Sequence, residues 1–390
     1  MMERFTIAST GNLLFGPGTF AELDHQLALH GYMHVAFISS RTLSGTDRFL
    51  GVVRTLRAKG IAATVFTVSG EPTVASIDAV SESVATSGCD VVVGIGGGSA
   101  LDSAKAVSVM ALQLVTQKTS ISVKRYLEGV GDLTPPCERL PLIAIPSTAG
   151  TGSEATKNAV IADIGPKGFK KSLRHDAYIP DLVIIDPSLA VGLPRAVTAA
   201  SGLDALTQLM EAYTSNKANP FIDALALDAI GKAGNALPRL LETDPSDISS
   251  RSDMAYAAYI SGMSIANSGL GYVHGIAGPL GGLHAAAHGI LCGSLIAPVN
   301  RAMAGTHAHT DAYGIFTGKM ERIARLWHVE GLDGVVTHLE KLSGLANFPR
   351  LRTFGFTEPE LRTIGSKEVG RNSPVLIPSD NLVDILLSLW

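Results

Sequence analysis

The stretch from Val91 to Lys105 constrains the fold more than any other part of the chain. A short run of β-branched apolar residues leads into Gly96, Gly97 and Gly98, and good helix formers follow. Such an apolar run is typical of a parallel strand buried on both faces. Three glycines let the backbone approach a ligand closely, and Ser99 is a suitable N-cap for the next helix. The turn is predicted to hold a pyrophosphate, although it lacks the G-x-G-x-x-G fingerprint; the alternative is a tight turn without a ligand.

Strands and helices alternate through the first half of the chain. Strands are expected at residues 5–15, 34–38, 62–68, 90–95, 140–146 and 182–185, and helices at 19–30, 46–59 and 73–87. This alternation predicts right-handed crossovers and a parallel sheet, with ligands outside the carboxyl ends of its strands.

The second half of the chain follows a helical period. Helices are expected at 196–216, 221–242, 250–268, 272–279 and 283–299, with more beyond 310. We therefore predict an α/β dinucleotide-binding domain over residues 1–187 and an all-helical domain over 188–390, with the substrate site in the cleft between them.

Composition excludes several classes of protein. Apolar residues make up 46% of the 390 residues and charged residues 17%, which indicates a globular chain. A net charge of −4 argues against nucleic-acid or anionic-membrane partners, and no apolar run is long enough for a membrane span. The N-terminal residues 1–6 lack the apolar core of a signal peptide. The scattered cysteines Cys89, Cys137 and Cys292 predict a reducing, cytoplasmic location.

Two polar segments at strand ends are candidates for contacts with a nucleotide. Ser39-Ser40-Arg41 follows the second strand and carries no carboxylate to accept ribose hydroxyls, which favours NADP over NAD. The alternative is that Arg41 is merely a solvated loop residue. The loop from Ser147 to Glu154 alternates hydroxyls with glycines, which suits phosphate or ribose but is also common in turns.

Candidate catalytic residues lie in the helical half. Asp204 and Gln208 are four residues apart in an apolar segment, so they share one side of a helix. Three of the eleven histidines, His274, His284 and His288, lie close together further along. A straight helix would place His274 and His288 roughly 21 Å apart. The glycines and proline between them make an unbroken helix unfavourable, and a chain that doubles back would let both imidazoles join Asp204 in a three-ligand metal site.

These motifs together resemble those of the iron-containing (group III) alcohol dehydrogenase family. The similarity includes GGGSALDSAK, the Ser/Thr loop, Asp186-Pro187, the Asp204 helix and the histidine segment, and it covers nearly the whole chain. The resemblance implies a dehydroquinate synthase-like fold of an α/β nucleotide-binding domain and a helical domain. It also implies hydride transfer between NAD(P)H and an aldehyde or ketone, and a homodimer.

The resemblance also implies a set of cofactor contacts. Lys170 lies ten residues before Pro180, as does a family lysine near the nicotinamide ribose; the alternative is an unpaired surface lysine. Together with the glycine turn and the segment after the second strand, the candidate cofactor contacts are Ser40, Arg41, Gly96, Gly97, Gly98, Ser99, Asp102, Ser147, Thr148, Thr151, Lys170 and Leu189.

The implied metal site departs from the family pattern at one position. The family binds a divalent metal, iron or zinc, with one aspartate and three histidines. Asp204, His274 and His288 match three of these positions, but the fourth is Gln208, a poorer ligand than imidazole. Metal affinity is therefore expected to be reduced or lost, unless His284 supplies the missing nitrogen. Without a metal, a protonated histidine among His274, His284 and His288 would act as the acid.

Three rival functions remain open from the sequence. The chain also resembles maleylacetate reductases, which work without the full set of metal ligands. Those enzymes have Asn where this chain has Asp204, and His four residues later, where this chain has Gln208. A dehydroquinate synthase-like lyase would use NAD without net turnover. A nucleotide-binding protein with a decayed metal site would bind the cofactor and do no chemistry. Few charged residues lie near the proposed site, which favours a neutral or apolar substrate.

Overall fold

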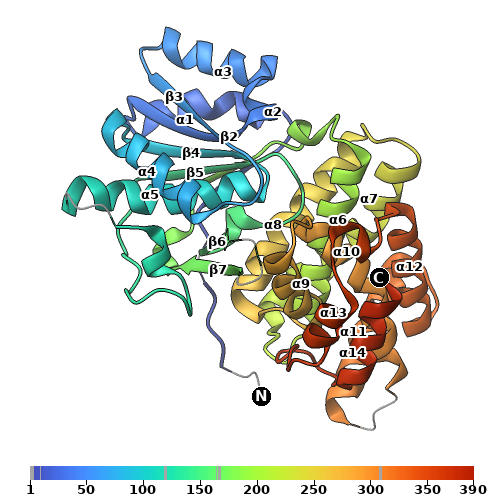
Figure 1. Cartoon of the computed structure of the whole chain (residues 1–390). Helices are drawn as coiled ribbons and strands as arrows, with labels where there is room; N and C mark the ends of the chain where they lie inside the picture. Colours follow the sequence, from blue (N-terminus) through green and yellow to red (C-terminus); the bar gives the residue numbers. More distant parts are fainter. Residues whose placement is uncertain (1–3, 9, 118–120, 164, 166–167, 307–309) are drawn as a thin grey trace.

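The computed structural model describes residues 4–8, 10–117, 121–163, 165, 168–306 and 310–390, which form two lobes (Figure 1). The first lobe contains a six-stranded parallel sheet in the order β1-β8-β5-β4-β2-β3. Its strands are β1 (Asn12–Phe15), β2 (His34–Ser40), β3 (Ala62–Val68), β4 (Val91–Gly96), β5 (Leu142–Pro146) and β8 (Leu182–Ile185). The expected fold class, a parallel-sheet lobe followed by an all-helical lobe, is confirmed.

Helices cover both faces of the sheet, because alternate residues of its central strands are apolar on both sides. These helices are α1 (Leu23–Leu29), α2 (Arg41–Ser44), α3 (Asp47–Ala58), α4 (Val74–Ser87) and α5 (Gly98–Gln117). Val35 and Phe37 of β2 pack beneath α1 and α3, whereas Ala36 and Ile38 pack beneath α4 and α5. Strands β2 and β4 are neighbours in the sheet. The chain passes from β2 to β3 on one side and from β4 to β5 on the other. Their carboxyl ends therefore flank the crevice where a nucleotide binds in such sheets.

The second lobe is built around α6 (Arg195–Thr214), which is buried without interruption from Gly202 to Met210. The other helices are α7 (Pro220–Glu242), α8 (Ile248–Ser268), α9 (Tyr272–Leu283), α10 (His288–Gly305), α11 (Asp311–Trp327), α12 (Gly331–Ala346), α13 (Glu358–Gly365) and α14 (Ser379–Ser388). The last sheet strand ends at Ile185 and α6 begins at Arg195, on either side of the expected domain boundary. Among the described residues, no helix is both long and apolar enough to cross a membrane.

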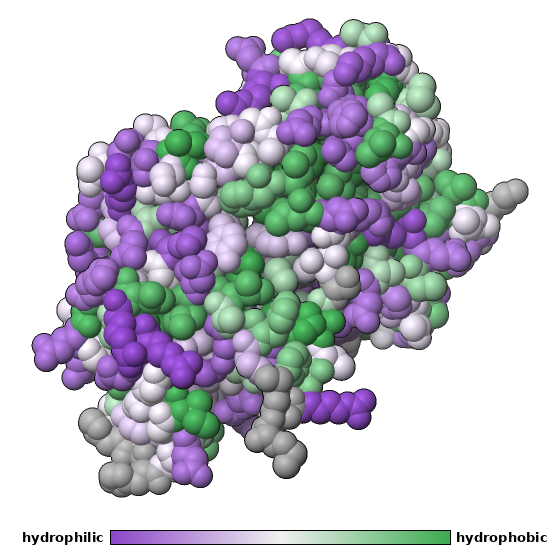
Figure 2. Space-filling model, turned by 180° about the vertical axis from the view of Figure 1, so that it is seen from behind, coloured by the Kyte–Doolittle hydropathy of each residue, from purple (hydrophilic) through white to green (hydrophobic). Residues whose placement is uncertain are grey.

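An antiparallel hairpin that the sequence did not predict lies between the lobes (Figure 1). It consists of β6 (Asn158–Asp163) and β7 (Phe169–Arg174). The backbone of Phe169 lies beside Gly282 at the end of α9, where an added Cβ would be 3.6 Å away. The hairpin thus connects the sheet lobe to the helix that carries His274. Figure 2, seen from behind, shows apolar surface gathering near the junction of the two lobes.

Local structure differs from the sequence predictions at three places. Helix α5 begins at Gly98, so Ser99 lies inside its first turn and is not the N-cap. Helix α9 continues through Pro279 to Leu283, because five of its apolar residues are buried and packing outweighs the cost of the proline. The chain reverses later, at residues 284–287. The expected first strand is limited to Asn12–Phe15, where it pairs with β8.

Candidate active site

The glycine turn after β4 is in contact with the Ser/Thr loop after β5. A Cβ on Gly98 would lie 2.5 Å from Cγ2 of Thr151, and one on Gly97 would lie 3.3 Å from Oγ1 of Thr148. Gly96 has a φ of +150°, which side chains rarely adopt. The structure therefore brings together two segments that the sequence assigned separately to the cofactor. The turn leads into α5. The first N–H groups of this helix have no acceptor within the helix, so they can bind an anion.

The same loop touches the helix that carries Asp204. A Cβ on Gly150 would lie 2.8 Å from Cβ of Ser201, which is three residues before Asp204 on α6. A Cβ on Gly152 would lie 2.4 Å from the backbone nitrogen of Gly262 on α8. Because the loop has only glycine at these two contacts, the candidate cofactor loop and the candidate catalytic helix are directly adjacent.

Other predicted cofactor residues have partners within the protein. Asp102 accepts hydrogen bonds from Oγ of Ser153 (2.5 Å) and from the backbone N–H of Val160 (3.1 Å), so it braces the Ser/Thr loop. Ser147 is buried at the start of that loop, and Leu189 is 9% exposed in a 3₁₀ turn after β8. Ser40 caps the short helix α2 by accepting from the N–H of Leu43.

Arg41 and Lys170 lie in different surroundings. Arg41 is the first residue of α2 and is exposed at the carboxyl end of β2. Lys170 on β7 is only 10% exposed, and its Nζ lies 3.0 Å from Oε2 of Glu71. Its Cδ lies 3.8 Å from the position of a Cβ on Gly281 in α9. The alternative of an unpaired surface lysine is therefore wrong, and Lys170 faces the helical lobe.

Four side chains of the helical lobe converge on one point. Asp204 on α6, His274 on α9, and His288 and Cys292 on α10 each offer a donor atom, and all four atoms lie within 4.8 Å of one another. Nε2 of His274 is 3.5 Å from Oδ1 of Asp204, and Nε2 of His288 is 3.9 Å from the same oxygen. The two rings have centroids 5.3 Å apart, because the chain doubles back between α9 and α10. We call these four residues the Asp204 cluster.

Glu211, which the sequence reasoning missed, orients one member of the cluster. Its Oε2 accepts from Nδ1 of His274 (2.7 Å), and its Oε1 accepts from the backbone N–H of Val273 (2.6 Å). A carboxylate on the outer nitrogen of a ligating histidine is a common arrangement in metal sites. The spacing of the residues could have identified Glu211, because Asp204, Gln208 and Glu211 lie at positions i, i+4 and i+7 and so share one face of a helix.

Gln208 and His284 have partners outside the cluster. Oε1 of Gln208 accepts from Oγ of Ser261 on α8 at 2.6 Å. His284 ends α9, where its Nε2 lies 3.2 Å from Oε2 of Glu360 and its ring packs on Phe356. The structure thus unites Asp204, His274 and His288 as predicted, but it does not place the imidazole of His284 beside them.

Comparison with known proteins decides the family. Residues 10–187 match the family model "Iron-containing alcohol dehydrogenase", and residues 198–387 match "Fe-containing alcohol dehydrogenase family, C-terminal". The chain belongs to the iron-containing alcohol dehydrogenase family. The predicted activity class, hydride transfer between a nicotinamide cofactor and an alcohol or its carbonyl compound, is confirmed by this membership.

Individual relatives agree with the family assignment. The chain is 38% identical to the probable alcohol dehydrogenase EutG of Escherichia coli over 287 residues, covering 73% of this chain and 70% of that one. It is 32% identical to the NAD-dependent methanol dehydrogenase of Bacillus methanolicus over 334 residues, covering 85% and 80%. The solved structure of a 1,3-propanediol oxidoreductase superposes over the full length of both chains with a TM-score of 0.86 at 26% identity.

The Asp204 cluster fits the divalent metal that this alcohol dehydrogenase family uses. Oδ1 of Asp204 is buried without a hydrogen-bond partner, which is costly unless a cation completes the site. Burial would raise the pKa of Asp204, but the neighbouring His288 and His274 lower it, so the carboxylate stays ionised.

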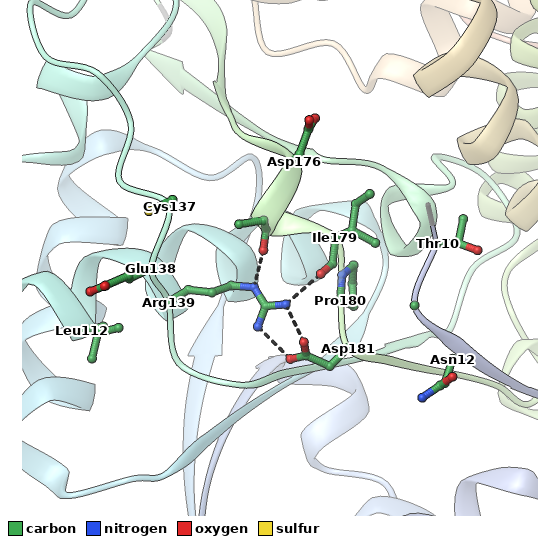
Figure 3. Close-up of a pocket in the computed structure, with 12 residues that line it drawn as sticks. Thr10, Asn12, Leu112, Cys137, Glu138, Arg139, Asp176, Ile179, Pro180 and Asp181 are labelled. Atoms are coloured by element: carbon green, nitrogen blue, oxygen red, sulfur yellow. Dashed lines mark hydrogen bonds and ion pairs between the residues drawn. The ribbon is translucent and has the colours of Figure 1, made fainter. Parts of the chain in front are cut away.

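A separate hollow of this alcohol dehydrogenase lies away from the Asp204 cluster (Figure 3). It has a volume of about 840 Å³ and surrounds Arg139 where β5 and β8 begin, opposite to the glycine turn. Arg139 is held by both carboxylate oxygens of Asp181 and by the carbonyls of Ala177 and Ile179. Because the N–H groups of its guanidinium already donate to these acceptors, Arg139 stabilises the fold and is not a binding site for an anion.

Proposed function

We propose that this enzyme reduces a small aldehyde or ketone, and oxidises the corresponding alcohol, at the Asp204 cluster. The observation that carries this proposal is the convergence of four donor atoms around an unpartnered, buried carboxylate oxygen. This point adjoins the candidate cofactor loop through Gly150 and Ser201. Chemistry and cofactor would therefore meet at one junction between the lobes.

The roles of the cofactor residues follow from their positions. The turn at residues 96–99 would hold the pyrophosphate, and the hydroxyls of Ser147, Thr148 and Thr151 would hydrogen-bond phosphate or ribose. Lys170, which faces α9, would approach the nicotinamide ribose. These groups would direct the nicotinamide ring toward the Asp204 cluster and so supply the proximity that hydride transfer needs.

Asp204, His274 and His288 would hold the metal. A divalent metal at this position acts as a Lewis acid on the carbonyl oxygen and stabilises the negative charge that develops there. Glu211 keeps Nε2 of His274 directed at the cluster by holding Nδ1. The neighbouring charged side chains are paired, Glu211 with His274 and Lys170 with Glu71, so we propose a neutral rather than a multiply charged substrate.

We propose NADPH as the preferred cofactor. No carboxylate follows β2, where Ser40 and the exposed Arg41 lie beside the crevice. An arginine there can bind the 2′-phosphate, and no acidic side chain in that segment would repel it.

We propose a homodimer located in the reducing cytoplasm. Strand β1 is a sheet edge, and its Leu13 and Phe15 are 44% and 38% exposed, so a second copy could cover them. The three cysteines are free, as in a reducing compartment. Light scattering during size-exclusion chromatography tests the dimer.

The metal content of the purified enzyme tests the main proposal. Oxidation of NADH and NADPH with a panel of aldehydes and ketones is measured before and after chelation. We expect one metal per chain, loss of activity on chelation and recovery on adding zinc or iron. Activity that survives complete removal of the metal would overturn the metal's role, and no turnover in any state would overturn the proposed function.

A further inference from the structure

Cys292 occupies the position that a fourth metal ligand would take. It lies one helical turn after His288 on α10, so both side chains project from the same face. Its side chain is completely buried, and its Sγ lies 3.6 Å from Nε2 of His274 and 3.6 Å from Nε2 of His288. The other two cysteines, Cys89 and Cys137, are more exposed and lie in the sheet lobe.

The spacing of the four donors suits a tetrahedral ion. Zinc bonds to nitrogen, oxygen and sulfur ligands at about 2.0–2.3 Å, so the edges of such a tetrahedron measure roughly 3.3–3.8 Å. Three donor separations in the cluster are 3.5, 3.6 and 3.6 Å, and the contact between His288 and Asp204 is 3.9 Å. The unpartnered Oδ1 of Asp204 belongs to this set, and it points independently to a missing cation.

Gln208 is less well placed for that role. Its amide oxygen accepts a hydrogen bond from Ser261 at 2.6 Å, and Gln208 is 3% exposed, so this buried oxygen already has a partner within the protein. An amide oxygen is also a harder ligand than a thiolate. Both observations favour the sulfur of Cys292 on α10 over the amide of Gln208 on α6 as a ligand.

We propose that Cys292, and not Gln208, is the fourth protein ligand of the metal, and that this Asp-His-His-Cys set selects zinc over iron. This inference rests on the proposed metal-dependent function. A thiolate is a soft ligand, and divalent zinc binds nitrogen and sulfur sites more strongly than divalent iron does. The sulfur also compensates for the affinity that the glutamine at position 208 would otherwise lose.

Cobalt substitution tests the ligand without relying on activity. The metal-free full-length protein is loaded with Co²⁺, and its absorption spectrum and metal stoichiometry are measured for the parent, Cys292→Ser, Cys292→Ala and the control Cys137→Ser. A thiolate ligand gives an intense sulfur-to-cobalt charge-transfer band in the near ultraviolet. We expect this band in the parent and in Cys137→Ser but in neither Cys292 variant. We also expect zinc affinity to fall about 100-fold in both Cys292 variants.

The parent spectrum keeps the test decisive if a Cys292 variant misfolds. One bound cobalt in the parent without the charge-transfer band, or no bound cobalt in the folded parent, overturns the assignment. Persistence of the band in Cys292→Ser also overturns it. Competition between zinc and ferrous iron under anaerobic conditions tests selectivity, and equal affinities would overturn that part.

The outcomes for Cys292 and for the proposed function are separable. Aldehyde reduction by a metal-loaded parent that lacks the band would leave the function intact and remove Cys292 as a ligand. A band without turnover on any aldehyde or ketone would keep the ligand and remove the function.

Discussion

In the candidate active site, Oε2 of Glu211 lies 2.7 Å from Nδ1 of His274, while Nε2 of the same ring faces Asp204. The carboxylate therefore fixes both the ring orientation and the nitrogen that carries the proton. We predict that Glu211→Gln weakens zinc binding about 10–100-fold, because an amide can rotate and is a weaker acceptor. Competition with a chromophoric chelator measures this. The control is Glu360→Gln, which alters the carboxylate beside His284 and should leave affinity unchanged; equal losses would contradict the orienting role.

His288 should be essential for turnover but not for cofactor binding. Its Nε2 belongs to the Asp204 cluster, whereas the glycine turn lies in the other lobe. We predict that His288→Ala lowers kcat by about 100-fold or more, which is several kcal/mol of transition-state stabilisation. The dissociation constant of NADPH, followed by nucleotide fluorescence, should change less than about twofold. Wild-type turnover in this variant would remove His288 from the site.

Gly98 should tolerate no side chain. The methyl group of Gly98→Ala would lie 2.5 Å from Cγ2 of Thr151, so the turn or the loop must move where the pyrophosphate is expected. We predict a loss of cofactor affinity of about tenfold or more, measured by fluorescence titration. Gly318→Ala in α11 is the matched control, since nothing lies within 4 Å of its added Cβ. Unchanged binding in Gly98→Ala would place the pyrophosphate elsewhere.

Arg41 should decide the choice between the two nicotinamide cofactors. It is exposed at the end of β2, where a 2′-phosphate would lie. We predict that Arg41→Ala lowers kcat/KM for NADPH about tenfold and leaves the value for NADH nearly constant, because only NADPH carries the extra charge. Steady-state kinetics with both cofactors provide the check. A parallel decrease with both would assign Arg41 to a structural role.

The contribution of Glu154 to stability should fall as the pH rises from about 4.5 to 7, because burial raises the pKa of this carboxyl group from 4.5 to about 7. In this window the folded state holds a proton that the unfolded state has released, so deprotonation favours unfolding. Lys105 titrates above the window, since burial lowers its pKa only to about 8. We predict that Glu154→Gln removes this contribution, so that its free energy of unfolding rises relative to that of the parent across this window, by on the order of 2 kcal/mol at pH 7.5. Urea unfolding at several pH values measures this, with the exposed Glu22→Gln as control; parallel curves for Glu154→Gln and the parent would refute it.

The sequence predicted elements well where one local pattern dominated. The apolar run Val35, Ala36, Phe37 and Ile38 predicted a strand, and the structure packs this strand beneath helices on both faces. The break between α9 and α10 was predicted at Pro279 but lies after Leu283. Helix propensity predicts a break at proline, but the buried face of α9 contributes more than the lost hydrogen bond costs.

The Asp204 cluster shows how much of a site a sequence can reveal. Asp204, His274 and His288 were predicted because they match a family motif, and the structure unites their donor atoms. Glu211 and Cys292 were missed. A glutamate on an apolar helix and a lone cysteine have many uses, and their spacing from Asp204 and His288 indicates only a shared helix face.

The sequence by itself determined the two-lobe architecture, the glycine turn, the order of the motifs and three of the four cluster residues. The architecture and the turn depend on periodicity and on residues close together in the chain, whereas the three cluster residues were found through the family motif. Only the tertiary structure decided that Cys292 rather than His284 accompanies the two imidazoles, that Glu211 holds His274, and that Lys170 pairs with Glu71. These contacts depend on the reversal between α9 and α10 and on the β6–β7 hairpin. Long-range packing sets both, because burial of apolar surface outweighs local preference.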